Sequence, residues 1–228
     1  MNILLFGATG MIGQGVLREC LLAEDVAQVL CVGRTSVALT HPRLKEFVLD
    51  DLFDLRAIEA ELAGVDACFY CLGPSSAGMA EGPYTRITYD LTLAAAQTLV
   101  GVAPASTFIY VSGAGTDSSE RGGIMWARVK GRTENALAAL PFRAVFLFRP
   151  GIIQPLHGIR SKTASYRVLY SLARPVFSLL RALMPGVVLT TAVLGQAMLA
   201  VARTGAPKRV LGAADIQALA STASIRRM

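Results

Sequence analysis

The sequence predicts an α/β fold in which helices cover both faces of a doubly wound parallel sheet. First, the chain opens with a short apolar run, a glycine-rich turn and a helical pattern, in that order. Second, short apolar runs alternate with helical segments as far as Gly151, as in parallel sheets with crossover helices. Third, the 228 residues are 53% hydrophobic and 17% charged, which is apolar enough to bury such a sheet on both faces.

The opening segment contains the most informative motif. Residues 2–6 are typical of a buried strand, Gly7, Gly10 and Gly13 form a G-x-x-G-x-x-G turn, and a helical periodicity follows over residues 16–21. This order is the one that binds the pyrophosphate of a dinucleotide. Glycines let the backbone approach the phosphates closely, and the helix N-terminus offers free N–H groups. We therefore predict a dinucleotide cofactor.

The second predicted strand, residues 29–32, indicates which dinucleotide. In an NAD-preferring site an acidic residue ends this strand and accepts a hydrogen bond from the ribose 2′-OH. Here the strand is followed by Gly33, Arg34 and Thr35, with no carboxylate. The planar guanidinium of Arg34 is suited to a 2′-phosphate. The prediction is NADP as cofactor, with NADPH preferred over NADH; the alternative is that Arg34 is only a solvated loop residue.

The remaining elements follow in order. Further strands are predicted at 44–49, 65–72, 107–112 and 144–148, and long helices at 83–100 and 122–140. After Gly151 the alternation stops. We expect one domain over residues 1–228, in which residues 151–206 form a small helical cap on the substrate side of the sheet.

Charge is distributed unevenly along the chain. Residues 135–214 contain ten Lys or Arg and no Asp or Glu, within a formal net charge of +6. This predicts a cationic lobe and favours an anionic small-molecule substrate or an anionic surface. A flat, apolar substrate that stacks on Trp126 is the alternative. The basic residues are scattered among aliphatic ones, so nucleic acid is not expected as a partner. Arg174, Pro175, Arg181 and Pro185 interrupt the apolar stretch 168–202, so no helix long enough to span a membrane is expected there. Membrane contact is expected to be peripheral at most, through Arg167, Arg174 and Arg181.

The four cysteines fall inside predicted helices or strands, at Cys20, Cys31, Cys68 and Cys71. They are expected to be buried free thiols of a reducing compartment. Cys68 and Cys71 have a C-x-x-C spacing, but residues three apart on a strand point to opposite faces, so we expect no metal site. No basic segment precedes the first strand, and the expected location is the cytoplasm.

Taken together, these motifs resemble the short-chain dehydrogenase/reductase superfamily, which has a Rossmann fold, and in particular its atypical NAD(P)H-binding, epimerase-like branch. Besides the glycine turn, the resemblance rests on residues that follow successive strands: Asp51, Gly73, Ser112 and the run Arg149-Pro150-Gly151. The implied cofactor contacts are Gly7, Thr9, Gly10, Met11, Ile12 and Gly13 at the phosphates, Arg34 and Thr35 at the 2′-phosphate, Asp51 and Leu52 at the adenine, Cys71, Leu72, Gly73 and Lys130 at the riboses, and Pro150, Gly151, Ile152 and Ile153 at the nicotinamide.

The chain departs from this superfamily at the catalytic position. Active members carry a Tyr-x-x-x-Lys pair on the helix after the fifth strand, and residues four apart share one helix face. Here Lys130 occupies the lysine position, but Trp126 occupies the tyrosine position. An indole N–H only donates, so it cannot exchange a proton with substrate. Losing such a group costs a factor of about 10² to 10⁴ in rate. Ser112 is retained, and the catalytic candidates are Ser112, Lys130 and Trp126.

Three functions remain open at this point. The first is an oxidoreductase that reduces a small carbonyl or quinone-type substrate by hydride transfer; its proton would come from Tyr84, Tyr89, Tyr166, Tyr170 or a water held by Ser112 and Lys130. The second is a non-catalytic NADPH-binding regulator that acts through protein partners. The third is a nucleotide-sugar epimerase or dehydratase, which would need the same missing tyrosine. Both a monomer and a homodimer are compatible with the sequence.

Overall fold

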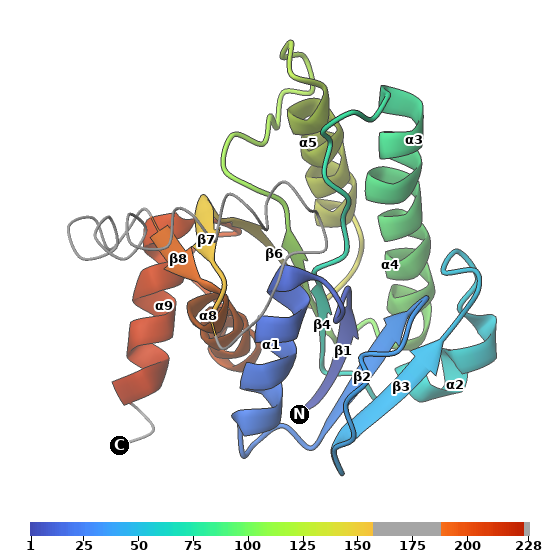
Figure 1. Ribbon diagram of the computed structural model, residues 1–228, viewed down its shortest axis with the longest axis vertical. Coiled ribbons are helices and arrows are strands. Elements are labelled where there is room, and N and C mark those ends of the chain that lie inside the picture. Colours follow the sequence, from blue (N-terminus) through green and yellow to red (C-terminus); the bar gives the residue numbers. More distant parts are fainter. Residues whose placement is uncertain (157–187, 226–228) are drawn as a thin grey trace.

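The computed structural model describes residues 1–156 and 188–225 (Figure 1). Its main sheet contains β1 (Asn2–Phe6), β2 (Gln28–Gly33), β3 (Leu44–Val48), β4 (Ala67–Tyr70), β5 (Thr107–Val111), β6 (Ala144–Arg149) and β9 (Val210–Gly212). All the neighbouring pairs are parallel, in the order β3-β2-β1-β4-β5-β6-β9. The predicted doubly wound α/β fold is confirmed, and a seventh strand, β9, extends the sheet beyond the six that the sequence predicts.

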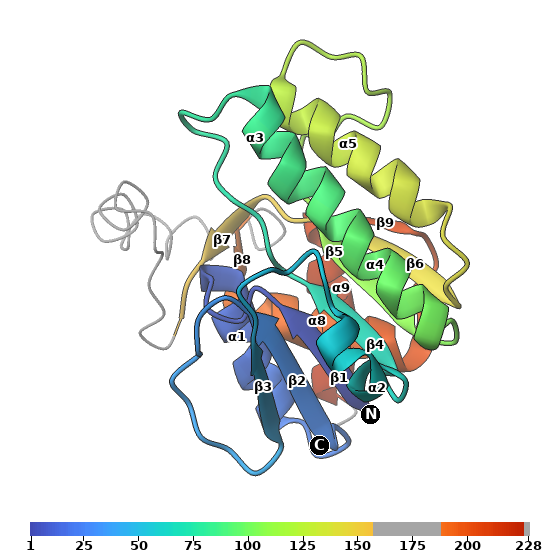
Figure 2. The ribbon, with the colours of Figure 1, turned by 90° about the vertical axis from the view of Figure 1, so that its right-hand side faces the viewer.

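Helices cover both faces of this sheet (Figures 1 and 2). Their bounds are α1 (Met11–Leu22), α2 (Glu59–Leu62) after a 3-10 turn η1 (Arg56–Ile58), α3 (Glu81–Thr85), a π-helical turn η2 (Arg86–Asp90), α4 (Leu91–Val102), α5 (Met125–Ala138), α8 (Thr191–Thr204) and α9 (Ala213–Ile225). The predicted helix 83–100 corresponds to the continuous run α3-η2-α4, and 122–140 corresponds to α5. Each predicted boundary differs by only a few residues from the observed one.

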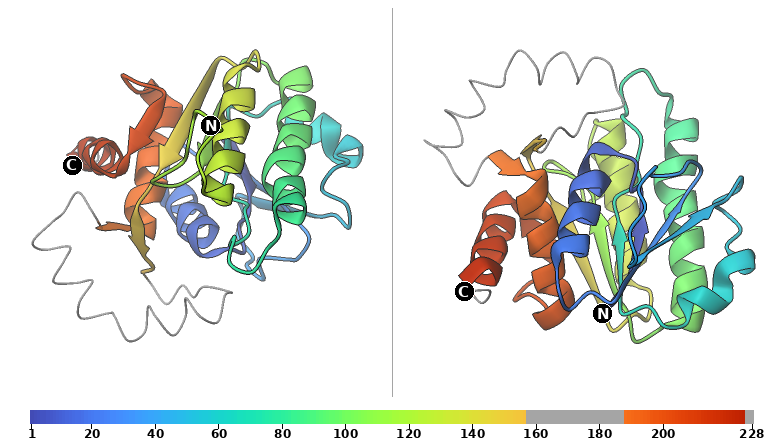
Figure 3. Two further views of the ribbon diagram at one scale, coloured as in Figure 1. Left: turned by 90° about the horizontal axis from the view of Figure 1, so that it is seen from above. Right: turned by 60° about the horizontal axis from the view of Figure 1, so that its bottom comes forward.

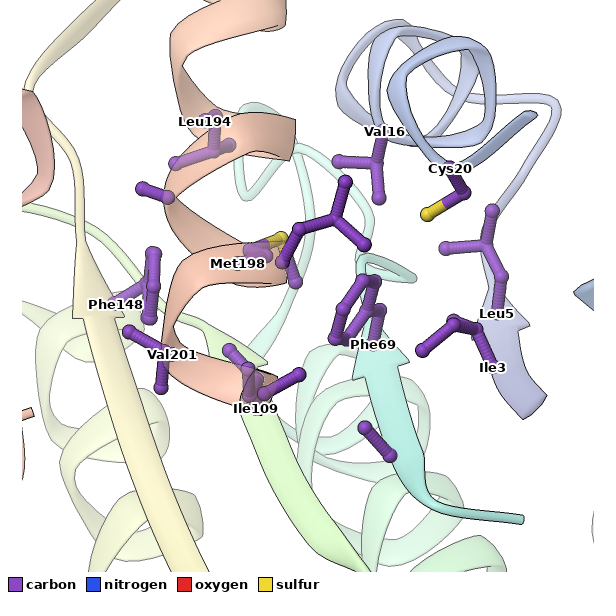
Figure 4. Close-up of a cluster of buried hydrophobic side chains, with 14 of the residues drawn as sticks. Ile3, Leu5, Val16, Cys20, Phe69, Ile109, Phe148, Leu194, Met198 and Val201 are labelled. Carbon is purple, nitrogen blue, oxygen red and sulfur yellow. The ribbon is translucent and has the colours of Figure 1, made fainter. Parts of the chain in front are cut away.

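Alternate residues along each strand point to opposite faces of the sheet and pack into two separate hydrophobic cores. Ile3 and Leu5 of β1 join α1 and α8 in one buried cluster, whose packing Figure 4 shows. Leu4 and Phe6 face the opposite way and join α4 and α5 in the other cluster. Because side chains alternate along a strand, a nearly continuous apolar run is what a sheet covered on both faces requires.

The described part of the predicted cap at 151–206 lies partly within the main body. Figure 3 shows α8 beside α1, and the Gln196 side-chain nitrogen of α8 donates to Glu19 of α1 at 3.0 Å. α8 therefore covers the sheet, where its apolar side chains join the core. Two short strands, β7 (Ile152–Gln154) and β8 (Val188–Thr190), pair in parallel as a separate small sheet. Residues 157–187 lie outside the described residues, so a substrate-side cap stays a prediction.

The predicted cationic lobe is only partly described. Three of its basic side chains are paired with acids: Arg149 with Glu134, Arg203 with Asp25 at 2.6 Å, and Lys208 with Asp215 at 2.9 Å. Acids from outside the acid-free segment therefore neutralise part of its charge. Arg143 donates to the Thr107 hydroxyl at 2.8 Å and Arg209 to the Ala138 carbonyl oxygen at 3.4 Å. The other five, which include Arg167, Arg174 and Arg181 for a peripheral membrane contact, lie outside the described residues. Among the helices that are described, none combines the length and apolar character needed to cross a membrane.

The four cysteines are free, as predicted. Cys68 packs in the α4/α5 core and Cys71 against the α1/α8 core, so the two thiols of the C-x-x-C spacing lie on opposite faces of the sheet. Burial raises the pKa of Cys31 to about 12. These thiols are therefore poor nucleophiles and poor metal ligands in the folded chain.

Candidate dinucleotide-binding site

A cleft of about 840 Å³ opens at the carboxyl ends of β1, β2, β3 and β4. The sheet order reverses here, since β1 lies between β2 on one side and β4 on the other. In doubly wound sheets this switch point is where ligands bind. The cleft contains ten of the predicted cofactor residues: Gly7, Thr9, Gly10, Arg34, Thr35, Asp51, Leu52, Cys71, Leu72 and Gly73.

The glycine turn forms one wall of the cleft, and its shape requires glycine. Gly7 has φ +81, and a Cβ there would lie 2.7 Å from the backbone carbonyl carbon of Cys71. A Cβ at Gly13 would lie 2.0 Å from the Gly7 carbonyl oxygen. Gly10 caps α1 without a side-chain hydrogen bond. The N-terminal turn of α1, which begins with Met11, follows directly on this turn, and a helix N-terminus offers the unpaired backbone N–H groups that a pyrophosphate requires.

Arg34 lines the cleft directly after β2. Its side chain is exposed and makes no ion pair with any residue that the structure describes. The loop that carries it is held by Glu46 of β3: the Ser36 hydroxyl donates to Glu46 Oε2 at 2.9 Å, and the Val37 backbone N–H donates to Oε1. Arg34 is thus a cation on an anchored loop, free to pair with a ligand.

Glu46 is a residue that the sequence analysis missed. No carboxylate directly follows β2 in the sequence. In space, however, the parallel register places Glu46 of β3 beside Cys31 of β2. Glu46 therefore lines the same cleft as Arg34. Both carboxylate oxygens already accept hydrogen bonds from the 36–37 loop. Glu46 therefore holds the 36–37 loop in place. Only the pairing of β2 with β3 could have shown that Glu46 belongs to the cleft.

The loop after β3 and the helical run α3-η2-α4 bring several apolar side chains to the cleft. Asp51 is turned back on its own loop, where Oδ1 accepts the Phe53 N–H at 2.9 Å. Leu52 is buried, and the helical run α3-η2-α4 contributes Ile87 and Leu91 to the opposite wall. Phe53, Arg86, Ile87 and Leu91 were not predicted as site residues, because their approach to the sheet edge depends on helix packing. Apolar side chains of this kind could pack against an adenine ring.

The catalytic candidates come together beside β5, outside the described cleft. The Lys130 ammonium, on α5, donates to the Ser112 carbonyl oxygen at 2.5 Å. Burial lowers the pKa of Lys130 to about 8, against the opposing effect of the nearby Glu134 carboxylate. The Ser112 hydroxyl lies 2.5 Å from Glu134 Oε1 and 3.1 Å from the Phe148 carbonyl oxygen. Its one hydrogen is therefore directed to internal acceptors, not to a substrate carbonyl.

Glu134 is itself an unpredicted member of this group. Its side chain is 1% exposed, and it pairs with the guanidinium of Arg149, which also donates to the Ser118 hydroxyl at 2.5 Å. The i, i+4 spacing of Lys130 and Glu134 on one helix was the only sequence signal for it. A buried network of Ser112, Glu134 and Arg149 therefore lies directly next to the lysine.

Trp126 is half-buried at the start of α5, and its ring lies against the glycine loop after β5. A Cβ at Gly115 would lie 3.4 Å from Cη2 of the indole. The predicted tyrosine donors do not replace it: Tyr84 is buried, and the ring of Tyr89 packs under Arg132, whose Cζ lies 4.1 Å from the ring centroid. Tyr166 and Tyr170 lie outside the described residues. The predicted nicotinamide contacts Pro150, Gly151, Ile152 and Ile153, with Met11, Ile12, Gly13 and Lys130, also do not line the described cleft.

No protein-family model matches this chain. A fungal relative, protein fmp52-1, mitochondrial, from Aspergillus terreus, is 27% identical over 158 residues, covering 67% of this chain and 66% of that protein. Protein HTATIP2 from Rattus norvegicus is 24% identical over 155 residues, covering 67% of this chain and 62% of that protein. The matched region thus spans just under two thirds of the length of these relatives.

Solved structures share the fold over nearly the whole chain. The UDP-glucuronic acid 4-epimerase from Bacillus cereus, in complex with NAD, has a TM-score of 0.65 at 12% identity, covering 93% of this chain and 76% of that one. A short-chain dehydrogenases/reductase protein from Saccharomyces cerevisiae has a TM-score of 0.63 at 17% identity, covering 96% and 98%.

The comparisons overturn one expectation and support another. The expected cytoplasmic location is wrong, because the similar proteins from Aspergillus and Eremothecium are named as mitochondrial. The missing presequence signal was poor evidence, since sequence patterning at one end of a chain does not identify its compartment. The expected fold is right: the chain has the Rossmann fold seen in the short-chain dehydrogenase/reductase and epimerase structures, and it is a distant relative of the FMP52 and HTATIP2 proteins.

Proposed function

We propose that this chain binds NADP(H) in the cleft at the switch point and reduces a small carbonyl or quinone-type substrate. The observation that carries the proposal is Arg34, an exposed cation that lies on an anchored loop and lines the same cleft as the glycine turn. A 2′-phosphate would be the anionic partner of the Arg34 guanidinium, because no acidic residue that the structure describes pairs with it. The Gly7–Gly13 turn supports the pyrophosphate, since added Cβ atoms would fill the space against the backbone there.

In this proposal the bound nicotinamide supplies the hydride. The chain's own task is to hold and deliver a proton, and Lys130 is suited to it. Its pKa of about 8 keeps the amine mostly protonated near neutral pH, while its hydrogen bond to the Ser112 carbonyl fixes its position. A water molecule held by Lys130 would carry the proton to the substrate oxygen. Without a tyrosine, we expect turnover to be slower by a factor of about 10² to 10⁴ than in active superfamily members.

A non-catalytic NADPH-binding regulator is the second candidate. Two observations favour it: an indole stands at the tyrosine position, and the Ser112 hydroxyl is directed to Glu134. Both remove proton donors from the reaction and leave the cofactor cleft intact. Fold similarity is the only support for the epimerase alternative, because an epimerase needs the same missing tyrosine.

Calorimetric titration of the full chain with NADPH and NADH tests the cofactor. We expect NADPH to bind more tightly, and Arg34→Ala to weaken NADPH by about tenfold or more while leaving NADH unchanged, as for loss of a charge-assisted hydrogen bond. Arg56→Ala is a matched control, because it removes an exposed arginine that pairs with Asp54, outside the cleft. Equal affinities of the two cofactors for the wild-type chain would contradict NADP selectivity.

The reaction is tested by NADPH oxidation with a panel of quinones, aldehydes and ketones. Turnover that falls in Lys130→Ala, with NADPH affinity kept within a few-fold, supports the reductase. Tight NADPH binding with no turnover on any of these compounds supports the regulator instead.

A further inference from the structure

The loop after β5 is bordered by a hydrogen-bond donor that the fold does not use. The Ser112 hydroxyl is directed to Glu134, and the Thr116 hydroxyl donates to the Gly113 carbonyl oxygen at 2.8 Å. The indole N–H of Trp126 makes no hydrogen bond within the part of the chain that the structure describes. The buried, unpaired side-chain atoms of that part belong to Tyr70, Thr88 and Gln154. The indole nitrogen is therefore open to solvent or to a ligand.

Trp126 and Lys130 border the same short loop. Residues four apart on a helix share one face, so both side chains project from one side of α5. The Lys130 ammonium donates to the Ser112 carbonyl oxygen, where the loop begins. The indole lies further along it, since a Cβ at Gly113 would lie 4.0 Å from Cζ3 of the ring, and one at Gly115 would lie 3.4 Å from Cη2. A free N–H and an ammonium group therefore meet beside β5.

The chemistry of an indole restricts the reaction that it can assist. The Trp126 N–H can stabilise a negative oxygen, but it cannot protonate that oxygen at ordinary pH. Hydride addition to an aliphatic aldehyde or ketone leaves an alkoxide, whose conjugate acid has a pKa close to that of water, about 15.7. Hydride reduction of a quinone leaves a phenolate, whose conjugate acid resembles the tyrosine phenol, with a pKa of about 10. The phenolate is the oxyanion that a donor without a transferable proton can sustain.

We propose that the substrate of this site is a quinone, and that the Trp126 N–H donates a hydrogen bond to the oxygen on which negative charge develops. This inference rests on the proposed function, because it narrows the substrate of the same reaction from carbonyl compounds in general to quinones. It gives Trp126 a catalytic role of its own, in place of the proton transfer that an indole cannot perform.

The reaction balances with one hydride and one proton. When bound, the reduced nicotinamide supplies the hydride: its C–H bond breaks, an O–H bond forms at one quinone oxygen, and the ring becomes aromatic as both C=O bonds become C–O bonds. The other oxygen is the phenolate held by the Trp126 N–H. It takes its proton from water beside Lys130. The quinone gains two electrons and becomes a hydroquinone, while NADPH is oxidised to NADP.

The first test follows binding without turnover, through the chain's single tryptophan. The full chain is saturated with NADP, which cannot reduce a quinone, and is titrated with menadione, a small naphthoquinone. A quinone beside the indole should quench Trp126 emission in a saturable way, and excess butanal should not relieve the quenching. A loss of emission that stays linear in menadione would show random collisions, and it would overturn the inference.

The second test compares NADPH oxidation by menadione and by butanal in variants of Trp126. Trp126→Phe keeps an aromatic ring and loses the N–H, so kcat with menadione should fall by about 10²-fold with KM little changed, as for loss of one oxyanion donor. Trp126→Tyr introduces a group that can transfer a proton, so butanal reduction should rise by about 10²-fold or more. The preference for menadione over butanal should therefore collapse in Trp126→Tyr.

Arg132→Ala is the control on the same helix. Its guanidinium covers the ring of Tyr89, with Cζ 4.1 Å from the centroid, and is not part of the proposed site. It should leave the quenching and both rates unchanged. Thermal unfolding should show that every variant is folded, and the wild-type titration and substrate preference need no variant at all.

Two kinetic results would also overturn the inference. Equal kcat/KM for menadione and butanal in the wild type would show that a proton donor is present, and unchanged kcat in Trp126→Phe would show that the N–H is not used. In both cases the proposed reductase stands. If the wild-type chain binds NADPH but oxidises it with none of these compounds, the proposed reductase fails and this inference falls with it.

Discussion

The buried Glu134–Arg149 pair gives the sharpest prediction for stability. Glu134 is 1% exposed and Arg149 is 20% exposed at the side chain, so the carboxylate is almost fully removed from water. Glu134→Ala would leave the partly buried Arg149 guanidinium with the Ser118 hydroxyl as its remaining hydrogen-bond acceptor. Removing one member of a buried ion pair costs about 3 to 5 kcal/mol, because the other charge is left uncompensated. That is a large part of the roughly 5 to 15 kcal/mol that stabilises a typical domain.

The assay is urea unfolding followed by far-ultraviolet circular dichroism. Glu134→Ala should lower the free energy of unfolding by about 3 to 5 kcal/mol. Glu134→Gln keeps an acceptor for Ser112 and should cost less. Glu81→Ala is the control, since Glu81 pairs with Arg128 at 2.8 Å but is 54% exposed, and such pairs contribute less than about 1 kcal/mol.

A double-mutant cycle separates the pair from general damage. If the uncompensated guanidinium causes the loss, Arg149→Met in the Glu134→Ala background should recover part of it. The reasoning is refuted if Glu134→Ala costs no more than Glu81→Ala, or if the second substitution adds a full, independent loss.

Three further outcomes are expected. Gly13→Ala should abolish dinucleotide binding in calorimetry, because its Cβ would lie 2.0 Å from the Gly7 carbonyl oxygen; Gly101→Ala, with open space around it, should leave binding intact. Burial lowers the pKa of Lys130 to about 8 from its ordinary 10.5, so the unfolded chain binds this proton more tightly. The stability of the wild type relative to Lys130→Met should therefore rise between about pH 8 and 10.5 and be flat below pH 8, and a flat profile throughout would argue against a buried amine. The four thiols should react slowly with a disulfide reagent in the native chain and rapidly in urea, because burial raises the pKa of Cys31 to about 12 and raises that of the others too.

Local patterns were sufficient for most elements and for the glycine-turn side of the candidate cleft. β1, the glycine turn and α1 are contiguous, so their geometry depends on neighbouring residues, and Gly7, Gly10 and Arg34 line the cleft as the motif predicts. β9 was not predicted because a strand of three residues is too short to show an alternating hydrophobic pattern. α8 was assigned to a cap because its apolar face is equally compatible with a cap and with a core.

By itself, the sequence determined the fold class, the succession of six strands along the chain and the position of the glycine turn, because each depends on residues that are neighbours in the sequence. Tertiary structure alone decided which distant side chains meet. Strand register brings Glu46 under the Arg34 loop, helix packing brings Arg86 over Phe53, and α5 buries Glu134 against Ser112 and Arg149. The reason is physical: these contacts join elements whose separation along the chain carries no periodic signal, and their free energy arises only once the sheet has assembled and excluded water.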